Sequence, residues 1–367
     1  MLHLENTMVY LMHVNWFWIK QRPHFLAEKL RSYFNITVLS PESFRENKQL
    51  IITKKPSFVK FYKILPLQRF KKSIIHQRLD NAIIICQIRK YVKKSKYIWI
   101  TSPLDYLIVR KCINQSQLVV YDCMDDFLEF PSIKSCSKLT SNYFVAEQEL
   151  LVRANAVFAS SKYLKEKLQA RYKGISQIFV INNAISSTFF IQNNTRSEVT
   201  YPENYGFTDL IYIGTISYWL DFDLLLESLV HFNKIRYILI GPSERNIPIH
   251  DRIIYLGLRK HKELLAYMKK ANALIMPFIV NDLIKSVNPV KLYEYISSGR
   301  PIITCSYEEI EQFNGFGYKY NNNSEYFVLL DRLIKNELKQ KEDKICRDFL
   351  ESNNWENRAD LISKMLL

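Results

Sequence analysis

Two charged residues in the second half of the chain, Lys291 and Glu294, stand three positions apart in the stretch NPVKLYEYISSGRPIIT. Pro289 suits the first turn of a helix and Gly299 suits its end, which predicts a helix over about 289–298. A lysine beside the free backbone N–H groups of a helix start can bind phosphate. A carboxylate one turn later can accept hydrogen bonds from two ribose hydroxyls. Together the two side chains would bind a nucleoside diphosphate.

The same spacing also fits a local ion pair on a helix surface, worth roughly 0.2–0.5 kcal/mol. On spacing alone we favour that simpler interpretation. The elements around the two residues are therefore needed to decide between a surface pair and a binding site.

Short apolar segments alternate with amphipathic helical patterns along both halves of the chain. The strand-like runs are 8–14, 36–40, 97–101, 118–122, 156–160 and 178–182, then 210–214, 236–241, 253–257, 273–278 and 301–304. The helical patterns include 24–33, 142–154, 162–172, a helix around 223–230 and one over 261–270, with a helical tail from about 323. This alternation predicts an α/β fold with parallel sheets covered by helices.

The chain of 367 residues is longer than one hydrophobic core normally grows, which predicts two domains. The polar stretch 191–208 is the natural linker. We therefore expect a first domain over 1–192, a second over 207–345, and a C-terminal helical segment over 346–367.

Three glycines, Gly214, Gly241 and Gly257, each end a strand-like run of the second domain. In open α/β sheets ligands bind outside the carboxyl ends of the strands, and glycine lets backbone approach a ligand closely. Glycine also ends many strands that bind nothing, so the set favours a ligand site only modestly. The chain has no GxGxxG or GxxxxGK[ST] motif, which argues against dinucleotide oxidoreductases and P-loop enzymes.

The net charge of +15 is concentrated in the first half of the chain. Residues 45–96 alone carry 15 basic and two acidic side chains. Such an excess favours an anionic partner: nucleic acid, an acidic membrane or a phosphorylated substrate. Basic residues interleaved with aromatic and aliphatic ones over 58–78 suit an anionic membrane surface, although a solvated basic face is the alternative.

Several other classes are not supported by the sequence. No apolar run approaches the ~20 residues of a membrane span, and the N-terminus lacks a signal-peptide pattern. The six cysteines form no CxxC pair, which favours a reducing compartment. The seven histidines form no HExxH pattern, so we expect no metal.

The stretch around Lys291 resembles the donor-binding signature of two-domain, GT-B-fold glycosyltransferases. The segments INNAISSTFF (181–190) and YIGTISYWLDFDLLLESL (212–229) are similar to other parts of that family in the same order. WFWIKQRPHFLAEKL (16–30) and VVYDCMDDFLEF (119–130) resemble a bacterial subgroup typified by teichuronic acid and surface-polysaccharide glycosyltransferases. The resemblance implies two Rossmann-like domains facing across a cleft, with a C-terminal helix containing Trp355 crossing back to the first.

The resemblance also implies a donor site in the second domain, where Lys291 would neutralise the leaving diphosphate and Glu294 would hold the ribose. The further donor-binding residues that it implies are Gly214, Thr215, Gly241, Arg259, Asn288, Pro289 and Val290. Two departures from the family pattern put retention of anomeric configuration in doubt. Ser286 stands where many retaining members have a second glutamate, and the loop after Thr215 offers no basic residue. A non-catalytic partner with this fold therefore stays open.

In the first domain, an inverting mechanism would need a general base, for which Asp125 and then Asp122 are the candidates. Capping of the following helix is the alternative role for each. Trp18, Lys20 and Arg22 lie in a loop whose aromatic and basic residues suit a sugar face and a phosphate, although Trp18 could equally pack under the loop.

These expectations describe a metal-independent bacterial glycosyltransferase without a cofactor. It would transfer a sugar from a UDP- or GDP-type donor, bound by the second domain, to a surface polysaccharide or lipid-diphosphate-linked acceptor, bound by the first. We expect it in the cytoplasm, peripheral on the inner face of the membrane. The alternatives are a nucleotide-sugar 2-epimerase of the same fold and a basic nucleic-acid-binding protein, for which no recognisable motif is present.

Overall fold

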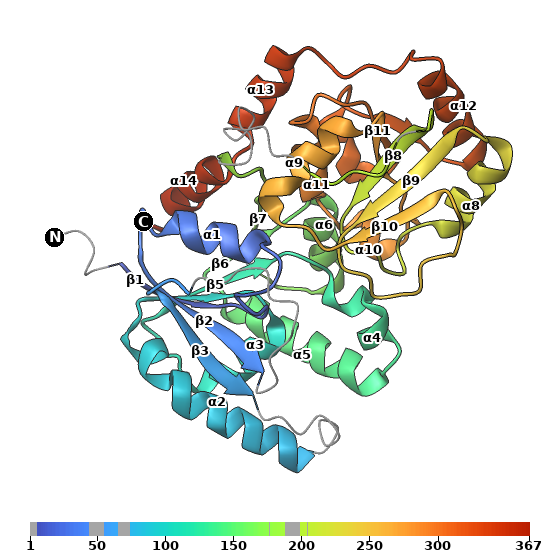
Figure 1. Ribbon diagram of the computed structural model, residues 1–367. Helices are drawn as coiled ribbons and strands as arrows, with labels where there is room; N and C mark the ends of the chain where they lie inside the picture. The colour runs from blue at the N-terminus through green and yellow to red at the C-terminus, as the bar shows by residue number, and fades with distance from the viewer. Residues whose placement is uncertain (1–5, 44–54, 65–73, 176, 188–198, 204) are drawn as a thin grey trace. The chain divides into compact units, whose positions relative to one another are not determined.

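The computed structural model describes residues 6–43, 55–64, 74–175, 177–187, 199–203 and 205–367 (Figure 1). The chain divides into two compact units. The first unit comprises Met1–Asn182 together with Trp355–Leu367, and the second comprises Asn183–Asn354. None of the described helices has the length and apolar character needed to cross a membrane.

The first unit is built on a parallel sheet of seven strands in the order β3-β2-β1-β4-β5-β6-β7. The strands are β1 (Thr7–Leu11), β2 (Asn35–Ser43), β3 (Val59–Ile64), β4 (Tyr97–Ile100), β5 (Leu118–Cys123), β6 (Ala156–Ala159) and β7 (Ile178–Val180). The central strands β4 and β6 are buried along their whole length. This burial explains their continuous apolar runs, because helices cover both faces of a parallel sheet.

Helices pack on both faces of this sheet. They are α1 (Arg22–Leu30), α2 (Ile74–Lys94), α3 (Pro103–Val109), α4 (Pro131–Lys134), α5 (Ser137–Arg153), α6 (Lys162–Arg171) and α14 (Trp355–Leu366), with the 3-10 helices η2 (Arg110–Cys112) and η3 (Phe127–Glu129). The helix α14 packs beside α1, as Figure 1 shows, although more than 300 residues separate them. Trp355 is fully buried and stacks on Phe25 with the ring centroids 5.3 Å apart.

The second unit repeats the plan with a parallel sheet of six strands in the order β10-β9-β8-β11-β12-β13. The strands are β8 (Thr208–Ile213), β9 (Ile235–Ile240), β10 (Ile253–Gly257), β11 (Ala273–Met276), β12 (Ile302–Cys305) and β13 (Tyr318–Tyr320). The other elements are α8 (Phe222–His231), α9 (His261–Lys270), α10 (Asp282–Lys285), α11 (Val290–Ile296), η5 (Glu308–Phe313), α12 (Asn323–Ile334) and α13 (Asp343–Ser352). Both units thus have the alternating α/β order that the sequence pattern predicts, with the sheets parallel throughout.

Three features differ from the sequence-based expectations. Residues 59–64, read as part of a membrane-binding stretch, form strand β3, which pairs with β2. The tail from 323 is not one continuous helix, because α12 ends at Ile334 and α13 begins at Asp343. The return to the first unit begins at Trp355 and not at 346, since α13 belongs to the second unit.

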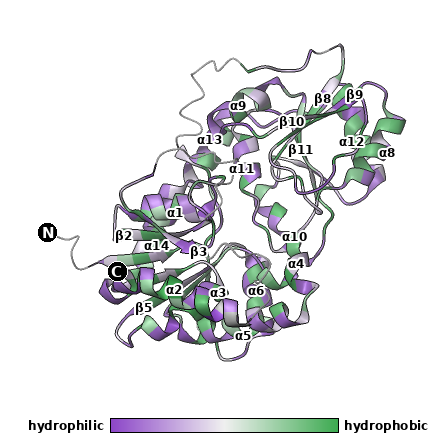
Figure 2. Ribbon diagram, turned by 60° about the horizontal axis from the view of Figure 1, so that its bottom comes forward, coloured by the Kyte–Doolittle hydropathy of each residue, from purple (hydrophilic) through white to green (hydrophobic). Residues whose placement is uncertain are grey.

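The expected linker 191–208 lies mostly outside the described residues. In the first unit, Figure 2 shows both hydrophilic and hydrophobic residues along α2. Ile84, Ile88 and Val92 of α2 are buried against the sheet. This spacing of four residues is that of an amphipathic helix on a core.

Candidate functional site

The helix α11 carries Lys291 and Glu294 and is fixed to the second sheet by the tyrosine that follows them. It runs from Val290 to Ile296, with Pro289 as its N-cap residue, and is shorter than the expected 289–298. Tyr295 is fully buried, and its hydroxyl accepts a hydrogen bond of 2.8 Å from the backbone N–H of Ile213 at the end of β8. The anchor holds α11 at the carboxyl edge of the sheet, where ligands of open α/β sheets bind.

Glu294 is buried and forms contacts with two cationic or potentially cationic side chains. Its Oε2 lies 2.7 Å from Lys291 Nζ, and its Oε1 lies 3.1 Å from His261 Nε2. Burial alone would raise the pKa of Glu294, but the charge of Lys291 and the hydrogen bond from His261 outweigh burial and lower the pKa to about 2. Glu294 is therefore a carboxylate over the whole neutral range. We call Glu294, Lys291 and His261 the Glu294 group.

The local pair expected from the spacing is thus present, but it is only part of a larger arrangement. A surface pair on one helix would leave both side chains exposed, whereas the Glu294 side chain is 5% exposed and is also held from α9. The Lys291 side chain stays about one-third exposed, so it is not closed off from solvent. The arrangement offers one accessible positive charge beside a fixed carboxylate.

His261 is the member of this group that sequence reasoning missed. It is the first residue of α9, which follows strand β10 after three residues. His261 and Glu294 are 33 positions apart, and no sequence pattern predicts a contact over that distance. The available signal was its place just after the strand-ending Gly257, at the carboxyl edge that the parallel topology predicts.

Two of the strand-end glycines, Gly214 and Gly241, lie close to each other. A Cβ atom on Gly241, whose φ is +141°, would lie 2.0 Å from the carbonyl oxygen of Gly214. One on Gly214 would lie 2.7 Å from the Tyr212 hydroxyl. We expected these glycines to admit a ligand; at Gly241 the close neighbour is backbone of the same sheet. The two glycines let the ends of β8 and β9 run close together.

The other expected donor residues take different positions. Asn288 is buried, and both its side chain and its carbonyl bind Asn183, at 2.9 and 2.6 Å. Arg259 is half-buried, and its Nε donates to the hydroxyl of Tyr267 at 3.0 Å. Thr215 is half-buried, and its carbonyl accepts a hydrogen bond from Tyr212. Asn288 thus has a structural contact that the sequence did not predict.

Ser286, Pro289 and Val290 complete the segment before α11. Ser286, which stands where many retaining family members have a second glutamate, is fully buried. Its hydroxyl donates to the carbonyl of Asp282 at 2.8 Å. Pro289 is buried and has no N–H to donate, while Val290 is half-buried. The polar chemistry of the segment is therefore concentrated in Lys291 and Glu294.

In the first unit, Arg22 and Asp122 form a buried ion pair. Arg22 Nη2 lies 2.7 Å from Asp122 Oδ1, Arg22 Nε donates to both carboxylate oxygens, and Nη1 donates to the carbonyl of Ile181. Their side chains are 1% and 0% exposed. The phosphate-binding role expected for Arg22 and the role of base expected for Asp122 stay predictions; in the structure the two groups are paired with each other inside the unit.

Asp125 differs from its acidic neighbours. Asp122 binds Arg22, and Asp126 binds Arg171 at 2.6 Å and Lys167 at 2.9 Å. The Asp125 carboxylate is half-buried and forms no hydrogen bond or ion pair with the described residues. Burial raises the pKa of Asp125 to about 6; the charge of Arg22 opposes this effect, and Asp126 and Asp122 add to it.

The loop after β1 presents only some of its expected residues. Lys20 is bound to Glu28 at 2.6 Å and lies over the ring of Phe25. Trp16 is buried, whereas Trp18 is half-buried. Of the aromatic and basic residues proposed for a sugar and a phosphate, Trp18 and Lys20 remain partly open, with Lys20 already paired.

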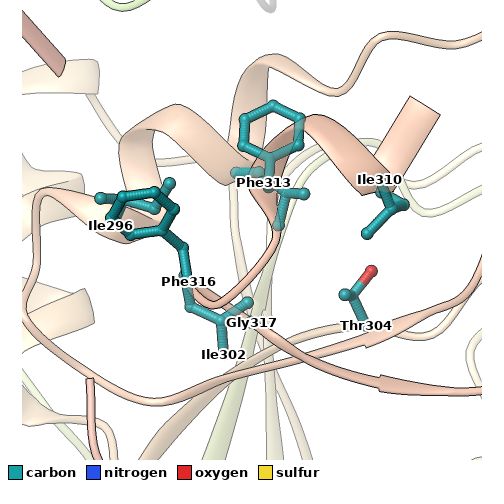
Figure 3. A pocket seen from close by; sticks show the side chains of 8 residues that line it. Ile296, Ile302, Thr304, Ile310, Phe313, Phe316 and Gly317 are labelled. Atoms are coloured by element: carbon teal, nitrogen blue, oxygen red, sulfur yellow. The ribbon is translucent and has the colours of Figure 1, made fainter. Parts of the chain in front are cut away.

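A small apolar pocket lies on another side of α11 (Figure 3). Its walls are Leu292 and Ile296 of α11, residues of β12, and the segment 310–317. Thr304 is the polar side chain among them, and its hydroxyl bonds to the carbonyl of Cys305. The pocket is a seam in the hydrophobic core and lacks the charged groups of a binding site.

The residues described by the structure contain no group of three His, Cys, Asp or Glu side chains that could hold a metal ion. The positive charge of the Glu294 group comes from Lys291 on α11, with His261 beside it.

Comparison with known proteins gives few sequence matches but many structural ones. No protein-family model matches the chain. A protein of Bacillus subtilis (strain 168), named as the teichuronic acid biosynthesis glycosyltransferase TuaH, is 24% identical over 219 residues. The match covers 56% of this chain and 54% of that protein, so the chain spans about half the length of this curated relative.

Solved structures align over nearly the whole chain. Sucrose-phosphate synthase from Thermosynechococcus elongatus matches with a TM-score of 0.73 and 12% identity over 98% of both chains. Anabaena Alr3699/HepE, solved in complex with UDP-glucose, matches with a TM-score of 0.67 and 13% identity over 98% of this chain and 99% of that one. The chain has the GT-B fold. The GT-B resemblance read from the sequence motifs is thereby confirmed at the level of the fold, with two Rossmann-like units.

Proposed function

We propose that the chain is a glycosyltransferase that takes its donor sugar from a nucleoside diphosphate bound at the Glu294 group. The observation that carries the proposal is the geometry of that group on the GT-B fold. A buried carboxylate and an accessible ammonium lie side by side at the carboxyl edge of the second sheet. The HepE structures with UDP and UDP-glucose, and the name of the Bacillus relative, agree with this choice.

The proposed roles follow from the charges of the group. Glu294 accepts hydrogen bonds from the ribose hydroxyls, because it stays ionised at neutral pH. Lys291 binds the diphosphate and stabilises the negative charge that develops as the bond between the anomeric carbon and the diphosphate oxygen breaks. In this proposal Lys291 supplies the positive charge that the leaving diphosphate needs. Sugar transfer should therefore persist in EDTA.

The acceptor contributes the oxygen of the new glycosidic bond and must lose a proton. We propose that Asp125 accepts this proton, which would make the reaction an inverting one. The carboxylate lies at the end of β5, where it is partly open, and its pKa of about 6 leaves it mostly ionised yet basic at neutral pH. The Bacillus relative suggests a cell-surface glycan or its lipid-linked precursor as the acceptor.

The first test is a binding panel with the full chain. UDP, GDP and their glucose, galactose and mannose derivatives are added in a thermal-shift assay, and each hit is measured by titration calorimetry. At least one nucleoside diphosphate should bind with a Kd in the micromolar to low millimolar range. If none of these compounds shifts the melting temperature at millimolar concentration, the proposal is wrong. Turnover of a bound donor without acceptor would favour the epimerase instead.

We also propose that the first unit associates with the anionic inner surface of the membrane through α2. Basic side chains line its exposed face, including Arg78, Arg89 and Lys90, and the exposed apolar side chains of Leu79 and Ile83 lie among them. This combination favours anionic lipid. The segment 65–73 of the original basic stretch lies outside the described residues.

Vesicle co-sedimentation tests this association. The chain should bind vesicles containing phosphatidylglycerol at low salt, and less so at high salt, because salt screens exposed charges. A variant with Arg78, Arg89 and Lys90 replaced by Gln should bind less than one with Lys344, Lys339 and Lys335 replaced by Gln. Equal binding by both variants would contradict the role of α2.

A further inference from the structure

The segment that begins the second unit binds the chain just before α11. Asn183 is the first residue of this unit. Its backbone N–H donates to Asn288 Oδ1 at 2.9 Å, and its side-chain Nδ2 donates to the Asn288 carbonyl at 2.6 Å. Both residues are buried. The two hydrogen bonds join positions 105 apart and reach the chain shortly before Lys291.

The contacts with Asn183 are shorter than other hydrogen bonds of the Asn288 side chain. Tyr293 donates to Asn288 Oδ1, and Asn288 Nδ2 donates to Glu309, each at 3.5 Å. That length is at the limit for a hydrogen bond. A buried carbonyl that loses its donor is costly, so the chain at Asn288 would shift if the Asn183 amide were removed.

The Asn288 carbonyl belongs to the peptide bond that leads into Pro289, which explains how the contact reaches Lys291. A peptide bond is planar, so a hydrogen bond that fixes its oxygen also fixes its plane. The proline ring restricts the next torsion, and φ of Pro289 is −80°. The helix α11 begins at the following residue, and the Leu292 N–H donates to the Pro289 carbonyl at 3.2 Å. Few torsions therefore stay free between the oxygen that Asn183 holds and the backbone of Lys291.

Asn183 can fix this peptide because the chain beside it is itself held in the second unit. Ile185 is 1% exposed and belongs to the hydrophobic core of that unit. Its backbone N–H donates to the carbonyl of Asn353, at the end of α13, at 3.0 Å. Tyr307 adds a hydrogen bond of 3.2 Å to the carbonyl of Val287. The segment before α11 is thus held by residues from distant parts of the chain.

The two charged residues of α11 differ in how much they depend on this segment. Glu294 is buried, and its carboxylate is also held by His261 from α9. Lys291 has a partly exposed side chain, so the place of its ammonium depends on the backbone from which it extends. That backbone lies between two anchors. Tyr295 holds α11 to the end of β8 after Lys291, and Asn183 holds the chain before it.

We infer that Asn183 is a positioning residue of the donor site, which holds the Asn288–Pro289 peptide so that Lys291 meets the diphosphate. Asn183 acts through this peptide and does not touch the nucleotide. The inference rests on the proposed function, in which Lys291 binds the diphosphate. It gives a role to a residue of the segment INNAISSTFF that the function proposed above leaves unused.

The neighbouring Asn182 provides a matched control. Its Nδ2 donates to the carbonyl of Ser160, which follows β6, at 3.1 Å. Asn182 and Ser160 both belong to the first unit. Asn182→Ala therefore removes an amide-to-carbonyl hydrogen bond of the same kind, one position away, and leaves the contacts of Asn288 in place.

The test is a double-mutant cycle on the full chain, with UDP and GDP as probes titrated by ligand-observed NMR. Asn183→Ala and the isosteric Asn183→Asp should each weaken the better nucleotide about fivefold, and Asn182→Ala should leave it unchanged. In the Lys291→Ala background, Asn183→Ala should cause less than about a twofold further loss, because the side chain that it positions is gone. A general structural effect would be equal in both backgrounds.

Parent-like nucleotide binding by both Asn183 variants would overturn the inference, as would the full fivefold loss in the Lys291→Ala background. Failure of the parent chain to bind either nucleotide would contradict the proposed donor site instead. Amide hydrogen exchange of the nucleotide-free protein is measured in the same variants. Asn183→Ala should raise exchange in α11 at least about threefold while β8 and β9 keep their protection, and Asn182→Ala should not. Unchanged exchange in α11 in both Asn183 variants would overturn the inference without any nucleotide.

Discussion

At the residue scale, the account depends on which charged side chains are paired within the protein and which remain available. Arg22 and Asp122 are buried and paired with each other, and Arg22 also donates to the carbonyl of Ile181. Lys291 and Asp125 stay partly open. The sequence named all four residues as candidates, but only the atomic contacts show that Arg22 and Asp122 are paired with each other.

His261 provides the first prediction at this scale. It holds one oxygen of Glu294, so His261→Ala should let the carboxylate turn and weaken nucleoside diphosphate binding about fivefold. His261→Gln can still donate a hydrogen bond and should recover most of the loss. Calorimetric titration with UDP or GDP measures both. Lys262→Ala, the exposed neighbour on the same helix, is the control; an equal loss in that variant would contradict a specific role for His261.

Asp105 provides a prediction about pH. Burial raises its pKa in the folded protein to about 7, whereas the unfolded chain has a value near ~3.9. Between these values the folded state binds more protons, so the contribution of Asp105 to stability falls as pH rises from about 4 to 7. Asp105→Asn should therefore stabilise the free protein by about 2 kcal/mol at pH 8 and very little at pH 4.

The titratable groups that face this carboxyl are Tyr62 on β3 and Tyr143 on α5, with Asp80 on α2 acting on Tyr62. Burial, and to a smaller extent these carboxylates, raises the pKa values of both tyrosines well above pH 8. The tyrosines therefore stay neutral between pH 4 and pH 8. Denaturant unfolding at both pH values measures the difference. A variant less stable than the parent at pH 8 would show that Asp105 has a stabilising partner in the free protein.

At the element scale, the carboxyl ends of β8 and β9 depend on two glycines. Gly241→Ala should cost more than about 3 kcal/mol, because the new Cβ meets the Gly214 carbonyl and the φ of +141° disfavours any side chain. Gly257→Ala is the matched control, since φ is +70° there but no atom lies within 4 Å of the new Cβ. It should cost about 1 kcal/mol. Equal losses would mean that the close approach is unimportant.

The same scale shows what a sequence can predict. Continuous apolar runs predicted β4, β6, β8, β9 and β11 within a few residues, because strands buried on both faces need no polar alternation. The edge strand β3 was missed because Lys60 and Lys63, set among aromatic and aliphatic residues, resemble an amphipathic surface. The strand β13 is three residues long and too short to carry a pattern.

The candidate site was predictable only in part, for a related reason. Lys291 and Glu294 were found because they lie in one helical turn, within reach of a spacing rule. The contacts His261–Glu294, Arg22–Asp122 and Asn183–Asn288 join residues 33, 100 and 105 positions apart. No local pattern predicts such pairs, since they depend on how the strands are ordered in the sheet.

At the scale of the whole molecule, the chain ends by completing the unit with which it begins. Trp355 of α14 is fully buried against Phe25 of α1, and Lys29 pairs with Glu356. Trp355→Ala should destabilise the first unit by about 3–5 kcal/mol through the cavity that it leaves. Leu361→Ala, at an exposed position of the same helix, should cost less than about 0.5 kcal/mol.

Amide hydrogen exchange locates the effect of Trp355→Ala. Protection should fall in α1, α14 and the first sheet, whereas the strands β8 to β13 of the second unit should keep theirs. Loss of protection confined to the second sheet would contradict the assignment of α14 to the first unit.

The central claim is that the second unit binds a nucleoside diphosphate through Lys291 beside Glu294. The most direct measurement is calorimetric titration of UDP and GDP into the parent chain, Lys291→Ala and the exposed control Lys344→Ala. The account predicts that Lys291→Ala weakens the better nucleotide at least about tenfold, because a phosphate loses its cationic partner, and that Lys344→Ala leaves it unchanged. Binding to Lys291→Ala within about twofold of the parent value would contradict the account.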